Sequence, residues 1–335
     1  MILLLIKSNL KQQKEKPTFL NRSALWSIVG YFIVVLGLSF GIFFVIRDFQ
    51  NLNIQILEFN LARLLLSFFI SLLSMFLAIL IWRSILRTNG LNHDFKHDLK
   101  VYVYSLLGYM LPGGVWTILV RGFLSKQVGN IKTPLTVMAG VVETILSGIS
   151  ALSLCILFLF LQNWTMSLPL TMPLLVGLIM LLIINPKIFT RITTWFFKLT
   201  NKSYPDTYLQ FTNANLFLWF LGELLVIIIG SLALFVLMSS FREVNLQILI
   251  LIIISWSFAV AVSSLFFWLP GTPFIRDGTM VGILSTKVTL GFAILFVVVQ
   301  RVWSIITILL LSLCLWIIFD LPNLVTKIKL IQKKY

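Results

Sequence analysis

Six charged residues lie within or beside long apolar stretches of this sequence, and their types suit the binding of a charged group. They are the arginines Arg121, Arg276 and Arg301 and the carboxylates Glu143, Glu223 and Asp277. A guanidinium matches the oxygens of a phosphate bidentately, and a carboxylate can balance that charge or contact a cation. A charge at the centre of a membrane helix costs roughly 2.5–3.5 kcal/mol on insertion scales, so these side chains should pair, face the protein interior or line water. The pattern predicts a polar interior site.

Two Pro-Gly interruptions accompany these charges. The first contains Pro112, Gly113 and Gly114, and the second contains Pro270 and Gly271. Proline removes a helix N–H, and glycine permits close or unusual backbone. Non-helical backbone at membrane depth persists only when it is buried in protein or lines a polar cavity. We therefore expect broken or re-entrant helices here, and ordinary proline kinks are the alternative.

The two interrupted stretches are similar enough to predict an internal duplication. Glu143 follows Pro112 by 31 residues, and Arg301 follows Pro270 by 31 residues. A Ser-Leu-Cys tripeptide comes next in each copy. The equal spacing predicts that Glu143 and Arg301 occupy equivalent positions and form an ion pair with each other. A pair that only fixes packing is the alternative to a pair within a binding site.

The elements that must position these residues are membrane helices. The chain has 335 residues, of which 59% are hydrophobic and 11% charged, and its mean hydropathy is +1.02. About 25% of a soluble domain would be charged. In lipid the backbone must satisfy its own hydrogen bonds, which favours helices, so we expect an all-α polytopic membrane helix bundle of about eight spans. Apolar runs place spans at 25–46, 64–82, 136–161, 173–185, 216–238, 247–268 and 288–319, the last being one tilted helix or a tight pair.

Charge placement predicts the topology. The segments 1–24, 83–100, 121–133, 186–211 and 320–335 hold 20 of the 26 Lys and Arg residues. The positive-inside rule places them, with both termini, on the cytoplasmic side of the cell (inner) membrane. This explains the net charge of +15 without nucleic acid. We expect a basic N-terminus at 1–24, one transmembrane domain at 25–320 with halves of about 25–185 and 212–320, and a basic tail at 321–335.

The sequence indicates no cofactor and no metal site. His93 and His97 have the i, i+4 spacing of a metal-binding pair, but no third ligand lies near them in sequence. We interpret this segment, which ends at Asp98, as a solvated polar turn in a cytoplasmic loop. The acidic residues of the loops form no recognisable catalytic constellation, which argues against a membrane-embedded transferase.

Residues 109–116, followed by Arg121 and Glu143, resemble the first signature of the lysylphosphatidylglycerol synthase transmembrane (flippase-type) family. Residues 269–278 look like its second signature, and a later arginine in a hydrophobic helix matches Arg301. Asp277 stands where the family has Glu, and Thr272-Pro273 replaces a glycine-rich backbone. The resemblance covers about residues 25–320.

This resemblance implies a domain that moves a charged or glycosylated lipid across the bilayer. Full-length family members carry a soluble transferase domain that makes an aminoacyl lipid, and we expect no such transfer from this chain. The implied partners are a phospholipid or polyprenyl-linked lipid and enzymes of lipid synthesis or glycosyl transfer, with a transferase or a scaffold role as alternatives. The expected cavity residues are Pro112, Gly113, Gly114, Trp116, Arg121, Glu143, Glu223, Pro270, Gly271, Arg276, Asp277, Gly278 and Arg301.

Overall fold

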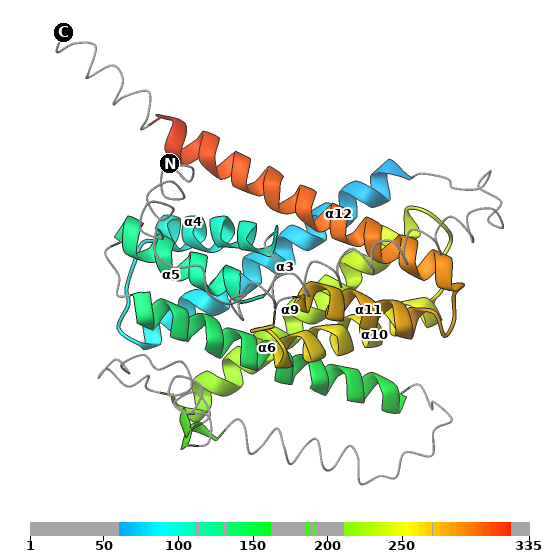
Figure 1. Ribbon diagram of the computed structural model, residues 1–335, viewed down its shortest axis with the longest axis horizontal. Coiled ribbons are helices and arrows are strands. Elements are labelled where there is room, and N and C mark those ends of the chain that lie inside the picture. Colours follow the sequence, from blue (N-terminus) through cyan, green and yellow to red (C-terminus); the bar gives the residue numbers. More distant parts are fainter. Residues whose placement is uncertain are drawn as a thin grey trace, which may run out of the picture. The chain divides into compact units, whose positions relative to one another are not determined.

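The computed structural model describes residues 60–110, 114–129, 133–161, 185–187, 190–191, 211–269 and 271–322, and these ranges contain helices and no strand. This confirms the all-α prediction (Figure 1). In chain order the helices are α3 (Leu61–Thr88), α4 (Phe95–Leu106), η2 (Leu107–Met110), α5 (Val115–Gly129), α6 (Thr133–Leu161), α9 (Asn213–Ser239), α10 (Leu246–Leu265), α11 (Thr272–Leu284), α12 (Leu290–Leu315) and η3 (Trp316–Asp320).

Five helices in the described ranges are long and apolar enough to cross a membrane. They cover Leu61–Thr88, Leu135–Leu159, Asn213–Ser239, Leu246–Leu265 and Leu290–Asp320. The expected span at 25–46 and nearly all of that at 173–185 lie outside the described residues, so the total of eight stays a prediction. The final apolar stretch is one helix, α12, which continues into a π-helical turn, η3. The alternative of a tight helix pair there is therefore wrong.

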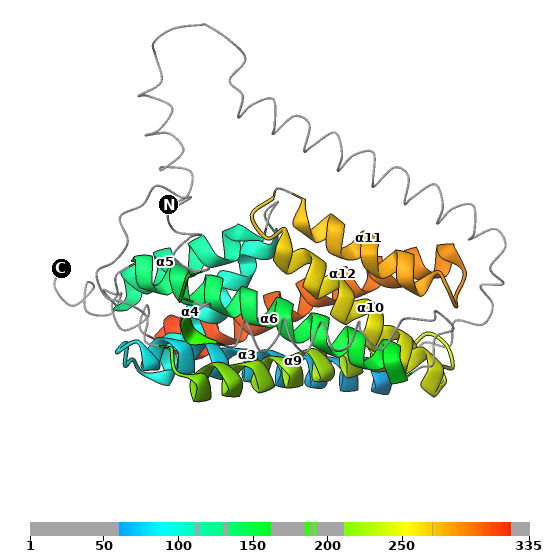
Figure 2. The same cartoon turned by 90° about the horizontal axis from the view of Figure 1, so that it is seen from below.

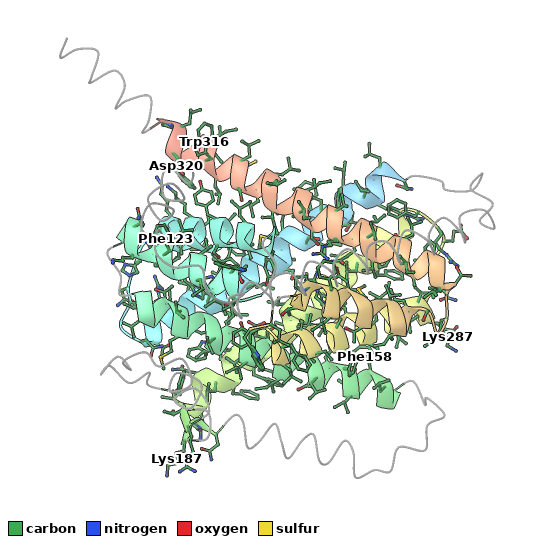
Figure 3. All side chains as sticks on the ribbon, viewed as in Figure 1. Phe123, Phe158, Lys187, Lys287, Trp316 and Asp320 are labelled. Carbon is green, nitrogen blue, oxygen red and sulfur yellow. The ribbon has the colours of Figure 1, made fainter. Side chains whose placement is uncertain are left out.

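The outer surface of these helices is apolar. On α3, Phe69 is 63% exposed and Leu66 is 51% exposed. Phe123 and Trp316 are likewise exposed on α5 and η3 (Figure 3). Soluble monomers rarely expose large contiguous apolar patches, whereas lipid-facing helices require them. The surface is therefore that of an integral membrane protein.

Helices α3 and α9 form an antiparallel pair. At one end, the backbone N–H of Asn60 donates to the carbonyl of Ser240 at 3.0 Å. At the other end, the indole Nε1 of Trp219 donates to Ser84 Oγ at 2.9 Å. Figure 2 shows the two helices lying together along one side of the bundle. The pairing places the start of α3 and the end of α9 at the same end of the bundle.

The same order of elements follows each Pro-Gly pair. The short helix α5 and the long helix α6 follow the first, and the short helix α11 and the long helix α12 follow the second. With 15 and 13 residues, α5 and α11 fall short of the ~20 residues that a span needs. Helix α6 packs against both α5 and α10, and α11 packs against α10 and α12. We call α5 and α6 the first half and α10, α11 and α12 the second half. The two halves therefore meet along α6 and α10.

The segment around the two histidines folds inward. Helix α4 begins at Phe95. Asp98 is only 2% exposed, and its Oδ2 lies 3.3 Å from Nε of Arg83 on α3. His97 Nδ1 lies 3.4 Å from Asp98 Oδ1. The prediction of a solvated turn is wrong here, because the first turn of α4 places this carboxylate against α3.

Candidate functional site

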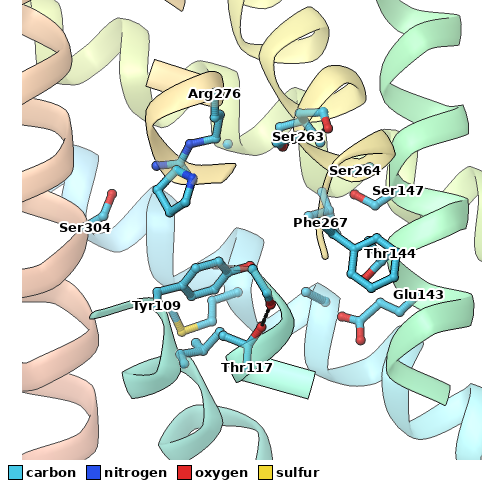
Figure 4. A pocket seen from close by; sticks show the side chains of 18 of the residues that line it. Tyr109, Thr117, Glu143, Thr144, Ser147, Ser263, Ser264, Phe267, Arg276 and Ser304 are labelled. Carbon is cyan, nitrogen blue, oxygen red and sulfur yellow. Dashed lines mark hydrogen bonds between the residues drawn. The ribbon is translucent and has the colours of Figure 1, made fainter. Parts of the chain in front are cut away.

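A cavity of about 530 Å³ lies among all eight α-helices of the described ranges. Its charged lining residues are Arg121, Glu143, Glu223, Arg276 and Arg301. In Figure 4, Arg276 and Ser304 lie on one side and Glu143 on the other. Its hydroxyl-bearing lining residues, besides two tyrosines, are Ser71, Ser74, Thr117, Thr144, Ser147, Ser263, Ser264, Thr272 and Ser304. Five of the six charged residues singled out in the sequence thus surround one polar space.

On the first wall, Arg121 of α5 is held in a closed network. Its Nη1 pairs with Oε2 of Glu143 on α6, and its Nε donates to Ser105 Oγ at 3.2 Å. Tyr102 donates its hydroxyl to Glu143 Oε1 at 2.8 Å, and the guanidinium lies 4.0 Å from the Tyr102 ring centroid. Arg121 is 5% exposed. Its donors are therefore largely used within the protein, and this network links α5 to α4 and α6.

On the second wall, two arginines share one carboxylate. Arg276 of α11 bonds Asp277 Oδ1 through Nε at 3.2 Å and Nη2 at 3.1 Å. Arg301 of α12 bonds Asp277 Oδ2 through Nη1 at 2.7 Å. The side chains of Arg276 and Arg301 are 21% and 32% exposed. This cluster has one positive charge in excess, and part of each arginine side chain is accessible.

The predicted ion pair between Glu143 and Arg301 is wrong. Glu143 pairs with Arg121, and Arg301 pairs with Asp277. The physical reason is that each short helix lies beside the long helix that follows it, so a partner from the same half is closer than one from the other half. Equal spacing identified equivalent positions but not their contacts.

Glu223 lies on α9 at the cavity wall and is 3% exposed. It forms no ion pair within the described part of the chain, and its Oε1 has no hydrogen-bond partner there. Ser147 of α6 supplies a hydrogen bond to the carboxyl group. Glu223 therefore differs from the carboxylates of Glu143 and Asp277, each of which contacts an arginine.

Of the residues described in the two Pro-Gly motifs, Gly114 lines the cavity and Gly271 does not. A Cβ added to Gly114 would lie 3.1 Å from the carbonyl oxygen of Phe267. The chain after the first Pro-Gly pair therefore lies against the chain before the second. Gly271, with φ of 101°, occupies the left-handed region at the start of α11, where glycine is favoured. Thr272 Oγ1 donates to the carbonyls of Phe266 and Leu269, both at 2.7 Å, which closes the turn before α11.

Other predicted site residues lie elsewhere. Trp116 and Gly278 are exposed, and neither lines the cavity. Pro112, Gly113 and Pro270 lie outside the described residues. The structure thus shows that some of the predicted motif residues line the cavity, whereas others are only close to them in sequence.

Sequence reasoning missed four aromatic residues of the cavity, which are Tyr102, Tyr109, Trp256 and Phe267. Tyr109 of η2 lines it (Figure 4). Trp256 of α10 lines it too, and its ring centroid lies 5.4 Å from the Arg276 guanidinium carbon. Such a distance allows a cation–π interaction. A lone tryptophan in the middle of an apolar span was the available signal for Trp256.

These observations define a polytopic α-helical membrane protein with a charged interior cavity. The family model described as the lysylphosphatidylglycerol synthase TM region matches residues 27–312, and the chain belongs to this family. A comparison with curated proteins finds no match. The family match includes every residue that lines the cavity.

Proposed function

We propose that this protein binds the headgroup of a charged or glycosylated lipid in the cavity and moves that lipid across the bilayer. The observation that carries the proposal is the cluster in which Arg276 and Arg301 share the single carboxylate of Asp277. Its excess positive charge and its partly exposed arginine side chains suit the phosphate of a phospholipid or a polyprenyl-linked lipid.

The opposite wall suits the rest of a headgroup. Glu143 and Glu223 face one arginine, Arg121, so this wall carries an excess of carboxyl groups. Carboxyl and hydroxyl groups accept hydrogen bonds from an amine or from sugar hydroxyls. The lipid tails stay outside, against the apolar surface of the helices. The cavity therefore offers separate places for the anionic and the polar or cationic parts of one headgroup.

The proposal includes the cellular setting. Both termini lie on the cytoplasmic side of the cell (inner) membrane in this proposal, which the basic loops support. There the lipid comes from enzymes of lipid synthesis or glycosyl transfer, which we propose as partners. The short helices α5 and α11 begin at the cavity, where Gly114 and Thr272 line it, and they supply the polar path along which the headgroup passes.

Proteoliposomes test this function. Vesicles of phosphatidylglycerol with a trace of acyl-chain NBD-labelled phosphatidylglycerol are treated with dithionite, which reduces only outer-leaflet label. Wild-type protein should expose inner-leaflet label to reduction. Arg276→Ala should slow this on the order of tenfold, as expected for the loss of a charge-assisted contact worth about 1.4 kcal/mol. Equal rates for wild type and Arg276→Ala would reject the mechanism.

Two further variants sharpen the test. Arg276→Lys keeps the charge but loses the bidentate fork, so its rate should fall between those of wild type and Arg276→Ala. Arg87→Ala is the matched control, because Arg87 is an exposed arginine at the end of α3 that does not line the cavity. Its rate should equal that of wild type. Thermal melting of each purified variant separates slow transport from misfolding.

A further inference from the structure

Glu223 stands apart among the carboxyl groups at this site. Glu143 and Asp277 each contact a guanidinium, whereas Glu223 contacts none in the described ranges. Its side chain is almost fully buried, and Oε1 has neither solvent contact nor a hydrogen-bond partner there. Burial without a cation is therefore the feature that sets Glu223 apart.

The groups that face Glu223 leave it without a compensating charge. From α6 come Glu143 and Ser147, from α5 comes Arg121, and from η2 comes Tyr109. Arg121 is already neutralised by Glu143. The cavity residues of α3, of α10 and of the turn after α10 are uncharged, and they are Ser71, Ser74, Met75, Ala78, Trp256, Val260, Ser263, Ser264 and Phe267. The charged cavity residues of α11 and α12 are Arg276 and Arg301, which contact Asp277.

Such a carboxyl group is more stable neutral than charged. An ionised carboxylate in an apolar environment without a partner loses its hydration, and the usual response is uptake of a proton. A cation that arrives next to it reverses this preference, because the new ion pair stabilises the charged form. Glu223 can therefore bind a proton or pair with a cation, but the two are alternatives, because a protonated carboxyl group has no charge with which to attract the cation.

We infer that Glu223 carries a proton in the resting protein and gives it up when the cationic group of a headgroup binds beside it. The exchange is balanced: the Glu223 carboxyl O–H bond breaks, the proton passes to water, and the carboxylate pairs with the ammonium group, which keeps its own protons. Binding of an amine-bearing lipid thus releases one proton. This inference rests on the proposed headgroup site and adds that amine recognition there depends on pH.

Soluble short-chain lipids test the exchange on the purified full chain. Dihexanoyl phosphatidylethanolamine carries an ammonium group, and dihexanoyl phosphatidylglycerol carries none. Isothermal titration in two buffers of different ionisation enthalpy counts the protons released on binding. Wild type should release about one proton per phosphatidylethanolamine bound, and its apparent Kd should fall up to about tenfold per unit rise in pH. Phosphatidylglycerol should bind without releasing a proton.

Two variants make the result specific. Glu223→Gln should bind phosphatidylethanolamine more weakly than wild type and with no proton release, and its melting temperature in the same detergent shows whether it is folded. Glu243→Gln removes an exposed carboxylate from the α9–α10 loop and should behave as wild type. The inference is overturned if wild type binds phosphatidylethanolamine without proton release, or if Glu223→Gln releases as many protons as wild type. Binding of neither lipid by wild type would instead overturn the headgroup site itself, and the inference with it.

Discussion

Glu143 and Arg301 lie at equivalent distances after the two Pro-Gly pairs, and each pairs with a residue of the preceding short helix rather than with the other. In the first half the short helix supplies Arg121 and the long helix Glu143. In the second half the polarity is reversed, because the short helix supplies Asp277 and the long helix Arg301. In both halves an ion pair thus links the short helix to the long helix that follows it, but the acidic and basic residues have exchanged places.

The pairing of Arg121 with Glu143 predicts the outcome of charge reversal. Glu143→Gln should destabilise the protein by about 3–5 kcal/mol, because it leaves a buried guanidinium unpaired. The exchange Arg121→Glu with Glu143→Arg should melt at a higher temperature than the single reversal Glu143→Arg, because it restores an ion pair. The exchange Glu143→Arg with Arg301→Glu should melt no higher than Glu143→Arg alone. Rescue by the second exchange, without rescue by the first, would contradict the observed pairing.

Asp277 competes with an anionic ligand for two guanidinium groups. Asp277→Asn should therefore tighten the binding of dihexanoyl phosphatidylglycerol on the order of tenfold, about 1.4 kcal/mol, since Arg276 and Arg301 lose their shared anion. Calorimetric titration measures the change. The same variant should melt at a lower temperature, because the link between α11 and α12 is weakened. Unchanged or weaker lipid binding in a folded Asp277→Asn protein would count against an anion site at this wall.

Helix packing between the halves depends on Gly148. A Cβ on Gly148 would lie 2.7 Å from Cβ of Ser264, closer than real Cβ atoms approach. Gly148→Ala should therefore separate α6 from α10 and cost about 1–3 kcal/mol, seen as a lower melting temperature. Gly278→Ala is the matched control, because nothing lies within 4 Å of its Cβ position. A Gly278→Ala protein that melts lower than Gly148→Ala would contradict this packing.

The antiparallel pair of α3 and α9 predicts opposite accessibility for two exposed positions. Arg87 is in the last turn of α3, and Glu243 follows the end of α9, beside the start of α3. In a background lacking Cys155 and Cys314, an impermeant maleimide should label Glu243→Cys in right-side-out vesicles and Arg87→Cys in inside-out vesicles. Labelling of both from the same side would exclude a membrane-crossing arrangement of α3.

The sequence predicted the membrane helices better than it predicted the contacts between their side chains. The spans expected at 64–82, 136–161, 216–238 and 247–268 correspond to α3, α6, α9 and α10, because an apolar run near twenty residues has one stable form in lipid. Arg121, Arg276 and Arg301 were found from their charge in apolar surroundings. Charge in an apolar stretch does not, however, say which neighbour neutralises it.

By itself the sequence determined that this protein is helical, lies in a membrane and keeps several charges inside the bundle, since hydration and backbone hydrogen bonding leave no other place for them. Only the tertiary structure decided which of those charges are satisfied. Packing of each short helix against the next long one neutralises Arg121 and divides Asp277 between two arginines, while Glu223 at the cavity wall contacts no arginine or lysine within the described residues. Which charged side chains pair depends on distances of a few ångströms between helices. Those distances cannot be read from the spacing of residues along the chain.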